Sequence, residues 1–167
     1  NVTKSNAQAH GMVFWDDIVA EVAQDYPRVE VERLLVDAAS MDLIRRPHEF
    51  DVIVASNLFG DILTDIGGAI SGSLGLAPSA NINPTGEYPS MFEPVHGSAP
   101  DIAGRSIANP LATVLSGAML FSHVGEEAAA TTVRNLVADQ LADGSAPRTP
   151  DLGGENGTLD VVADLRK

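Results

Sequence analysis

The sequence predicts an α/β fold in which short apolar strands alternate with amphipathic helices. Residues 12–26 space their apolar side chains like one helix face, whereas residues 51–55 form a short apolar run typical of a buried strand. Pro27 and Pro47 fall between such segments, and proline lacks the N–H that a continuing helix needs. Strand and helix patterns that alternate along one chain indicate a sheet layered with helices.

The first part of the chain supplies strands and helices in turn. The first two helices are expected to end near Pro27 and Pro47, because proline stops a helix. The strands are short apolar runs with enough alternation to place one face on a core. We expect strands at residues 2–4, 29–36 and 51–55, and helices at residues 12–26, 38–45 and 62–71.

The second part differs in composition, since residues 72–89 are rich in Gly, Pro, Ser and Asn. Asn109-Pro110 precedes a long apolar segment, and proline suits the first turn of a helix. We expect strands at residues 80–82 and 91–95, helices at residues 110–120, 126–141 and 159–165, and loops at residues 96–104 and 149–154.

The composition restricts the class of protein. The 167 residues suffice for a domain with a core, and their net charge of −13 opposes binding to nucleic acid or to anionic membranes. No apolar run is long enough to cross a bilayer, and the absence of cysteine excludes disulfides and thiolate metal sites. We therefore expect a cytoplasmic protein that binds neither nucleic acid nor a membrane.

The start of the chain is typical of a strand already in progress. Its first residue is Asn rather than Met, and Asn1-Val2-Thr3-Lys4 continues directly into the pattern of strand and helix. We therefore expect that an N-terminal half is missing, and that this chain alone is inactive even if its parent is an enzyme.

Two aspartates one helical turn apart are the most informative feature. Asp61 and Asp65 would lie on one helix face, where like charges repel and add nothing to helix stability. A hard divalent cation such as Mg²⁺ or Mn²⁺ reverses that balance, because these ions prefer carboxylate oxygens. The alternative is a pair of solvated acids near a helix N-terminus, where the helix dipole favours negative charge.

Two other residues stand at the ends of predicted strands, Lys4 as the last residue of one and Asp37 directly after another. Asp37 could join a metal site, because ligands of open α/β sheets gather at the carboxyl ends of strands, although a helix N-cap is its commoner role. Lys4 could act as a base in a cleft near a metal, the alternative being an ordinary exposed lysine.

The loop from Glu93 to Asn109 is a candidate ligand site. Its small residues allow close backbone approach, Asp101 could accept hydrogen bonds from ribose hydroxyls, and His96 could pack against an adenine ring. The alternative is a tight turn with a capping aspartate. No G-x-G-x-x-G is present, so a standard Rossmann dinucleotide site is unsupported.

Taken together, these segments resemble the β-decarboxylating dehydrogenase family, which includes isopropylmalate, isocitrate and tartrate/D-malate dehydrogenases. The stretch from Phe92 to Gly104 is long and specific. The matching segments run through nearly the whole chain in order: Val2–Asn6, Val36–Ala38, Asn57–Asp65, Gly72–Ala80, Phe92–Gly104, Ile107–Pro110 and Thr149–Gly154.

The resemblance implies an isopropylmalate-dehydrogenase-like fold with two lobes and a mixed sheet flanked by helices on both faces. The dinucleotide is bound in this family without a Rossmann fold. Residues 1–75 would finish the lobe that forms the dimer and binds the metal. Residues 76–167 would complete the cofactor lobe, so that the chain is the C-terminal part of one such domain.

The resemblance also implies roles for individual residues in a homodimer with shared active sites. Asp61 and Asp65 would bind Mg²⁺ or Mn²⁺ in one subunit, and Asp37 would reach in from the other. Lys4 would act across the dimer as the base that helps remove the hydroxyl proton. The adenosine part of NAD would be held by Glu93, His96, Gly97, Ser98, Ala99, Asp101, Ile102 and Asn109. Asp101 favours NAD, because a carboxylate pairs with the 2′-hydroxyl and repels a 2′-phosphate.

The implied reaction is oxidation of a small-molecule 2-hydroxy acid with NAD(P), followed by metal-dependent decarboxylation. Tyr88–Pro94 and Val13–Asp16 look most like the tartrate/D-malate branch, with 3-isopropylmalate dehydrogenase as the alternative and NAD isocitrate dehydrogenase third. A non-catalytic regulatory subunit is the remaining alternative. The presence of Lys4, Asp37 and the aspartate pair counts against it.

Overall fold

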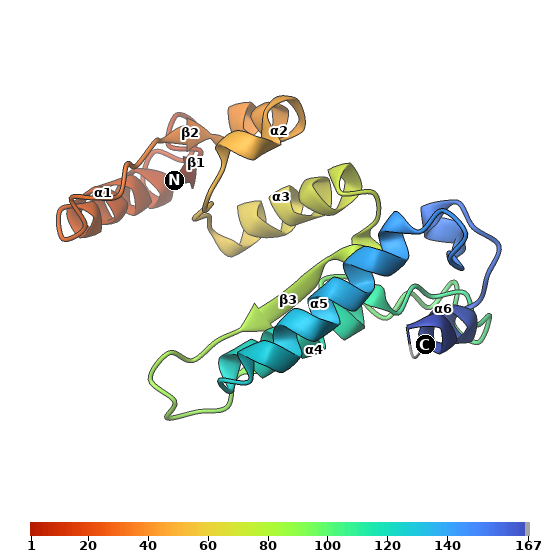
Figure 1. The fold of residues 1–167 in the computed structure, drawn as a ribbon. Helices are drawn as coiled ribbons and strands as arrows, with labels where there is room; N and C mark the ends of the chain where they lie inside the picture. The colour runs from red at the N-terminus through yellow and green to blue at the C-terminus, as the bar shows by residue number, and fades with distance from the viewer. Residues whose placement is uncertain (166–167) are drawn as a thin grey trace. The chain divides into compact units, whose positions relative to one another are not determined.

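The computed structural model describes residues 1–165, which fall into two compact units (Figure 1). The first unit is Asn1–Ile70 and the second begins at Ser71. Each unit contains helices, a strand pair and its own cluster of buried apolar residues, so the chain is α/β.

The first unit packs helices against a short parallel strand pair. β1 (Val2–Thr3) pairs with β2 (Leu34–Leu35), and α1 (Gly11–Ala23) connects them in sequence. Its buried cluster joins the strand pair to the two later helices through Val2, Ala39, Leu43 and Leu63. Those later helical elements are α2 (Val36–Arg45), η1 (Pro47–Glu49) and α3 (Asn57–Ile70).

The second unit is built on an antiparallel hairpin and a helix pair. β3 (Pro78–Asn81) pairs with β4 (Met91–Pro94), and α4 (Leu111–His123) packs on both the hairpin and α5 (Glu127–Ala142), as Figure 1 shows. Leu111, Val137 and Val161 form its buried cluster. The remaining elements are η2 (Leu74–Leu76), η3 (Pro150–Leu152) and α6 (Thr158–Asp164).

The mixed sheet that the resemblance implies is not confirmed, because residues 1–165 form one parallel and one antiparallel pair in separate sheets. The strand expected at residues 51–55 is not formed either. Val2 N donates to Val54 O at 2.9 Å, but Val52 stays 87% exposed. A strand is defined by hydrogen bonds to a neighbouring strand, and apolar spacing along the chain does not reveal whether that neighbour is present.

Most helices and the two strands of the second unit lie where the sequence predicts them, with shifted ends. The strand expected at residues 29–36 shrinks to Leu34–Leu35, because α2 already begins at Val36. α1 ends at Ala23, since residues 24–26 form tight i→i+3 turns before Pro27. α3 begins at Asn57, five residues early, where the Ser56 carbonyl accepts the Gly60 N–H at 2.7 Å.

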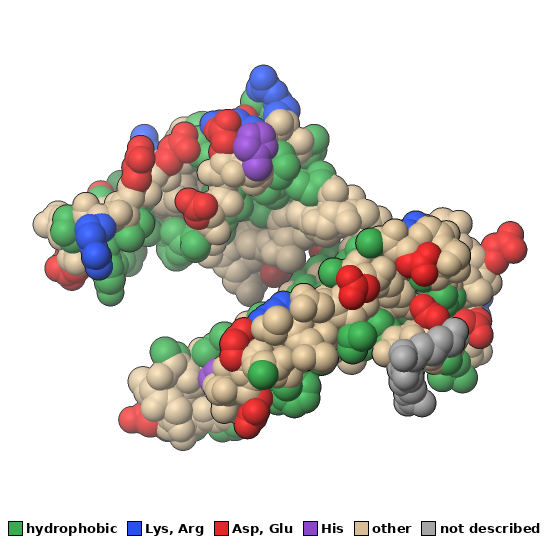
Figure 2. Space-filling view, in the orientation of Figure 1, with side chains coloured by type: hydrophobic (Ala, Val, Ile, Leu, Met, Phe, Trp, Pro, Cys, Tyr) green, Lys and Arg blue, Asp and Glu red, His purple; other side chains and the backbone are tan. Residues whose placement is uncertain are grey.

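The surface carries the acidic excess of the sequence. Figure 2 shows acidic side chains scattered over the drawn face of both units, with basic ones fewer. Among residues 1–165, no helix combines the length and the apolar character needed to cross a bilayer.

Candidate functional site

The parallel strand pair brings Lys4 and Asp37 together. Thr3 is in register with Leu35, so both strands end at the same edge and both residues leave it in the same direction. Lys4 Nζ donates to Asp37 Oδ1 at 2.5 Å, and the side chains are 26% and 66% exposed. This is a charge-assisted pair that a small molecule in solvent can approach.

The alternative role for Asp37, as the N-cap of the following helix, is wrong. Leu35 takes that position, and Asp37 lies within the first turn of α2, where the helix dipole favours a carboxylate. The hydrogen bond from Lys4, reinforced by the backbone N–H of Asp37, holds the pKa of this carboxyl below its usual range. Asp37 is therefore negatively charged at neutral pH.

Asp61 and Asp65 lie on consecutive turns of α3, and both are exposed. Neither carboxylate has a hydrogen-bond or ion-pair partner among the described residues. Two unpaired carboxylates on one helix face are a donor set that suits a hard divalent cation. Within residues 1–165, however, no third His, Asp or Glu joins them, so the predicted group with Asp37 is not assembled in this chain.

The predicted cofactor loop follows β4, whose exposed Glu93 is the first of the predicted residues. His96 Nδ1 lies 3.1 Å from the Gly97 carbonyl, and a turn follows in which Ile102 N donates to Ala99 O at 3.1 Å. Ala99 has a φ of 41°, a left-handed conformation that non-glycine residues seldom adopt. Such backbone outliers concentrate at ligand sites, and exposed Asp101 lies in this same turn.

Asn109, the last predicted cofactor residue, is an anchor of the loop. It is only 8% exposed, and its Oδ1 accepts from the Leu111 N–H at 3.0 Å at the start of α4. Its Nδ2 donates to Asp151 Oδ2 at 2.9 Å. These two bonds use the oxygen and one N–H of the Asn109 side chain. A cofactor would therefore contact the second side-chain N–H of Asn109 or its backbone.

Sequence reasoning missed Ser73 and Asp151, which complete this anchor. Ser73 Oγ donates to the same Asp151 Oδ2 and accepts from Gly75 N at 2.9 Å. Gly75 lets the segments approach closely, since a Cβ there would lie 2.7 Å from that of Asn109. The two partners are 78 residues apart, so no local spacing could reveal them.

Asp151 is ionised within this anchor. Burial acts to raise the pKa of its carboxyl, but hydrogen bonds led by that from Ser73 outweigh burial and hold the pKa below its usual range. The charge strengthens both hydrogen bonds that the carboxylate accepts. The anchor therefore joins three distant parts of the second unit through one anion.

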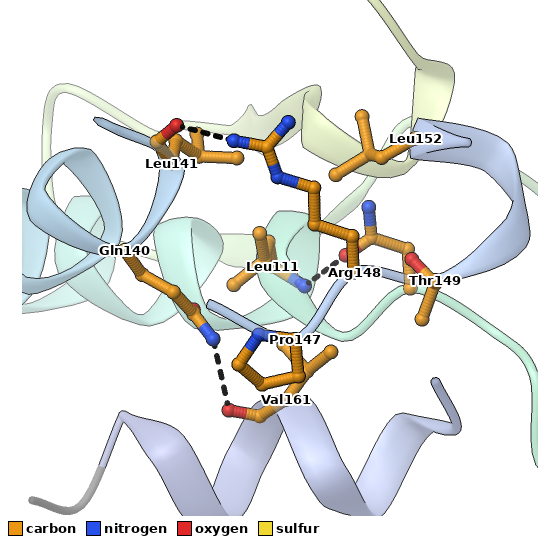
Figure 3. A pocket seen from close by; sticks show the side chains of 9 residues that line it. Leu111, Gln140, Leu141, Pro147, Arg148, Thr149, Leu152 and Val161 are labelled. Carbon is orange, nitrogen blue, oxygen red and sulfur yellow. Dashed lines mark hydrogen bonds between the residues drawn. The ribbon is translucent and has the colours of Figure 1, made fainter. Parts of the chain in front are cut away.

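The pocket in Figure 3 is a second candidate site, but it is part of the packed core of the second unit. Leu111, Leu152 and Val161 form its apolar wall, and the packed side chains leave no room for a water molecule. Gln140 Oε1 and Thr149 Oγ1 are buried there without a hydrogen-bond partner. Such groups cost stability, but a pocket that cannot admit a water molecule offers no place for a ligand.

The isocitrate/isopropylmalate dehydrogenase family model matches residues 1–165. The chain belongs to this family. It includes enzymes of the β-decarboxylating dehydrogenase type that the motifs from Val2 to Gly154 predict, so the recognition from sequence is confirmed.

Similar curated proteins carry names from two branches of the family. The chain is 48% identical over 165 residues to a probable tartrate dehydrogenase/decarboxylase of Bacillus subtilis, covering 99% of this chain and 46% of the relative. It is 53% identical over 156 residues to the 3-isopropylmalate dehydrogenase of Streptomyces griseus, covering 92% of this chain and 45% of the relative. The chain therefore spans about half the length of the curated relatives it matches.

The fold agrees with a solved relative. The crystal structure of isocitrate dehydrogenase from Methylococcus capsulatus matches with a TM-score of 0.90 and 40% identity. The match covers 99% of this chain and 50% of that one. The isocitrate/isopropylmalate dehydrogenase fold is thus shared along nearly the whole chain.

Proposed function

We propose that this chain forms part of an NAD- and divalent-metal-dependent dehydrogenase that oxidises and decarboxylates a malate-type 2-hydroxy acid, in the first place tartrate or D-malate. The observation that carries the proposal is the contact of Lys4 with Asp37, 2.5 Å long and open to solvent. It unites a proton-accepting group with a carboxylate in a chain of the decarboxylating dehydrogenase family.

Lys4 is proposed as the base. Once its ammonium has given up a proton, the amine can take the proton of the substrate hydroxyl. The hydrogen on the hydroxyl-bearing carbon would leave as a hydride to NAD, so that this carbon becomes a carbonyl. Asp37 holds the amine at the strand edge and stabilises the ammonium that results. The β-carboxylate then leaves as CO₂, and protonation of the remaining enolate completes the reaction.

The cofactors are proposed on the chemistry of the donor groups. Asp61 and Asp65 would hold Mg²⁺ or Mn²⁺, and the turn around Ala99 and Asp101 would receive the adenosine end of NAD. When bound, NAD supplies a hydride acceptor, and the cation supplies positive charge beside the substrate oxygens. The orientation of Lys4 and the exposure of the aspartate pair are the contributions of this chain.

A homodimer with shared active sites is proposed to complete the metal site. Asp37 does not join Asp61 and Asp65 within one copy, as far as residues 1–165 extend, so a second copy would supply it. Exposed apolar side chains on α2 and α3, such as Ile44 (60% exposed) and Leu58 (63% exposed), offer a surface for that contact. Sedimentation of the full-length enzyme as a monomer would contradict this arrangement.

The test is NAD reduction by the full-length enzyme on D-malate, L-tartrate, 3-isopropylmalate and isocitrate, with and without Mn²⁺. Metal-dependent turnover of D-malate or tartrate is expected. Preference for 3-isopropylmalate would retain the proposed mechanism and change the substrate. 3-Isopropylmalate is the second candidate substrate because of the 53% identity to the Streptomyces griseus relative. No turnover on any of the four acids would favour a non-catalytic regulatory subunit.

A further inference from the structure

One carboxylate in α1, that of Asp16, ties together the two strands that deliver Lys4 and Asp37. Asp16 Oδ1 accepts from Asn1 Nδ2 at 3.0 Å, directly before β1. Asp16 Oδ2 accepts from Arg33 Nη1 at 3.2 Å, directly before β2. The carboxylate therefore fixes the start of each strand, and the ends of the same strands carry the proposed base and its partner.

The sequence neighbours of Lys4 are also held in place. The hydroxyls of Thr3 and Ser5 act to lower the pKa of Asp16, and Thr3 is completely buried. Thr3 Oγ1 in turn accepts from Ser5 N at 3.2 Å. Lys4 thus projects from a backbone segment that is anchored on either side, which restricts where its Nζ can reach.

The surroundings of Asp16 favour one rigid arrangement. Its side chain is 12% exposed, and Trp15 Nε1 donates to Asn1 Oδ1 at 2.6 Å, which orients the amide that Asp16 accepts from. Burial acts to raise the pKa of Asp16, but the hydrogen bonds from its four neighbours outweigh burial and hold the pKa below its usual range. A largely buried anion held by hydrogen bonds to both of its oxygens favours a single geometry.

We propose that Asp16 is a positioning residue that sets the distance between Lys4 and Asp37, and through it the proton transfer at Lys4. The catalytic part of this inference rests on the function proposed above, whereas the positional part does not. Asp16 acts through β1 and β2, because its hydrogen bonds go to the residues that directly precede the two strands.

The first test measures the position of Lys4 without reference to activity. Asp16→Asn keeps the shape of the side chain but turns an N–H₂ toward groups that themselves donate, and Asp17→Asn is the exposed neighbouring control. Both variants of the full-length enzyme are acylated with an amine-reactive ester, and labelling of the Lys4 peptide is followed by mass spectrometry. Asp16→Asn is expected to label Lys4 several times faster than wild type or Asp17→Asn, because Nζ is released from Asp37. Labelling at the wild-type rate would overturn the proposal.

The second test reads the catalytic consequence. Asp16→Asn should lower kcat about tenfold or more while the KM values for NAD and substrate change little, because misalignment of a reacting group affects the chemical step. In a Lys4→Met background, Asp16→Asn should cause no further loss, and an additional loss there would show that Asp16 acts elsewhere. A wild-type enzyme without turnover would refute the proposed function, and the labelling experiment would still decide the role of Asp16.

A milder variant covers the case in which Asp16→Asn does not fold. Arg33→Gln removes only the ion pair between Arg33 and Asp16, directly before β2. Because the Arg33 side chain is 62% exposed, the fold should tolerate this substitution. Faster labelling of Lys4 is again expected. Unchanged labelling in this variant as well would leave the strand anchor without influence on Lys4.

Discussion

Asn109 and Asp151, far apart in sequence, share a hydrogen bond of 2.9 Å that fixes the end of the proposed cofactor loop to the turn at η3. Ser73 donates to the same carboxylate oxygen, so one anion holds three segments of the second unit. The carboxylate is thus placed to control how the loop presents itself to a dinucleotide.

Asp151→Asn should weaken NAD binding with little effect on the chemical step. The new amide would point an N–H₂ at the Asn109 amide, and loss of a hydrogen bond to a charged group costs about 1.5–3 kcal/mol. The KM for NAD is therefore expected to rise roughly tenfold or more at nearly constant kcat. Glu155→Gln, an exposed change nearby in sequence, should leave the KM for NAD unaltered. Equal KM values in the two variants would dissociate this anchor from the cofactor.

Asp61→Asn and Asp65→Asn should each reduce the affinity for Mn²⁺. Each removes one anionic oxygen donor from the exposed pair on α3, and hard cations depend on such donors. The loss is measured as free Mn²⁺ by electron paramagnetic resonance, without recourse to activity. Asp51→Asn, another exposed aspartate of the first unit, is the control and should bind as wild type does. Unchanged affinity in both α3 variants would exclude this helix face as the metal site.

Sequence patterns predicted the helices, the strands near residues 80–82 and 91–95 and the family, because these depend on local periodicity and on contiguous motifs. They also selected Lys4 and Asp37, although not their direct contact, which arises from a parallel pairing across 33 residues. The prediction of a strand at residues 51–55 was wrong, because strand pairing depends on segments that are distant in the sequence. Ser73, Asp151 and Asp16 were missed as functional residues for the same reason, since each acts through partners that only the fold brings near.

Asp101→Lys should shift cofactor preference from NAD toward NADP. A carboxylate repels a 2′-phosphate, and an ammonium at the same exposed turn attracts it. The ratio of kcat/KM for NAD to that for NADP should fall at least about tenfold, a change of ~1.4 kcal/mol. Asp101→Asn separates the two effects, because it removes the repulsion without adding a positive charge. An unaltered ratio in both variants would reduce the loop to a turn without a role in cofactor choice.

The stability supplied by Asp16 should disappear in acid. Its pKa is lowered in the folded chain from an ordinary value of 3.8, so the ionised form is favoured by folding. That contribution is fully present above the unfolded pKa and is lost as pH falls through the folded pKa. Urea unfolding should therefore show a large difference between wild type and Asp16→Asn at pH 7, and a smaller one at about pH 3. A difference that stays constant with pH would mean that the charge of Asp16 contributes nothing to stability.

Gly154→Ala should destabilise the second unit severely. A Cβ at Gly154 would lie 2.0 Å from the Arg148 carbonyl oxygen, which is far inside van der Waals contact and involves backbone that cannot move aside cheaply. The Arg148 carbonyl also accepts from Asn156 N at 3.0 Å, so a shift would break that bond as well. Overpacking of this kind costs about 3 kcal/mol or more, measured as the free energy of unfolding in urea. Gly144→Ala is the matched control, because nothing lies within 4 Å of a Cβ there, and it should alter stability by less than about 1 kcal/mol. Similar losses of unfolding free energy in both variants would show that the close approach of the Arg148 carbonyl does not explain the need for glycine at position 154.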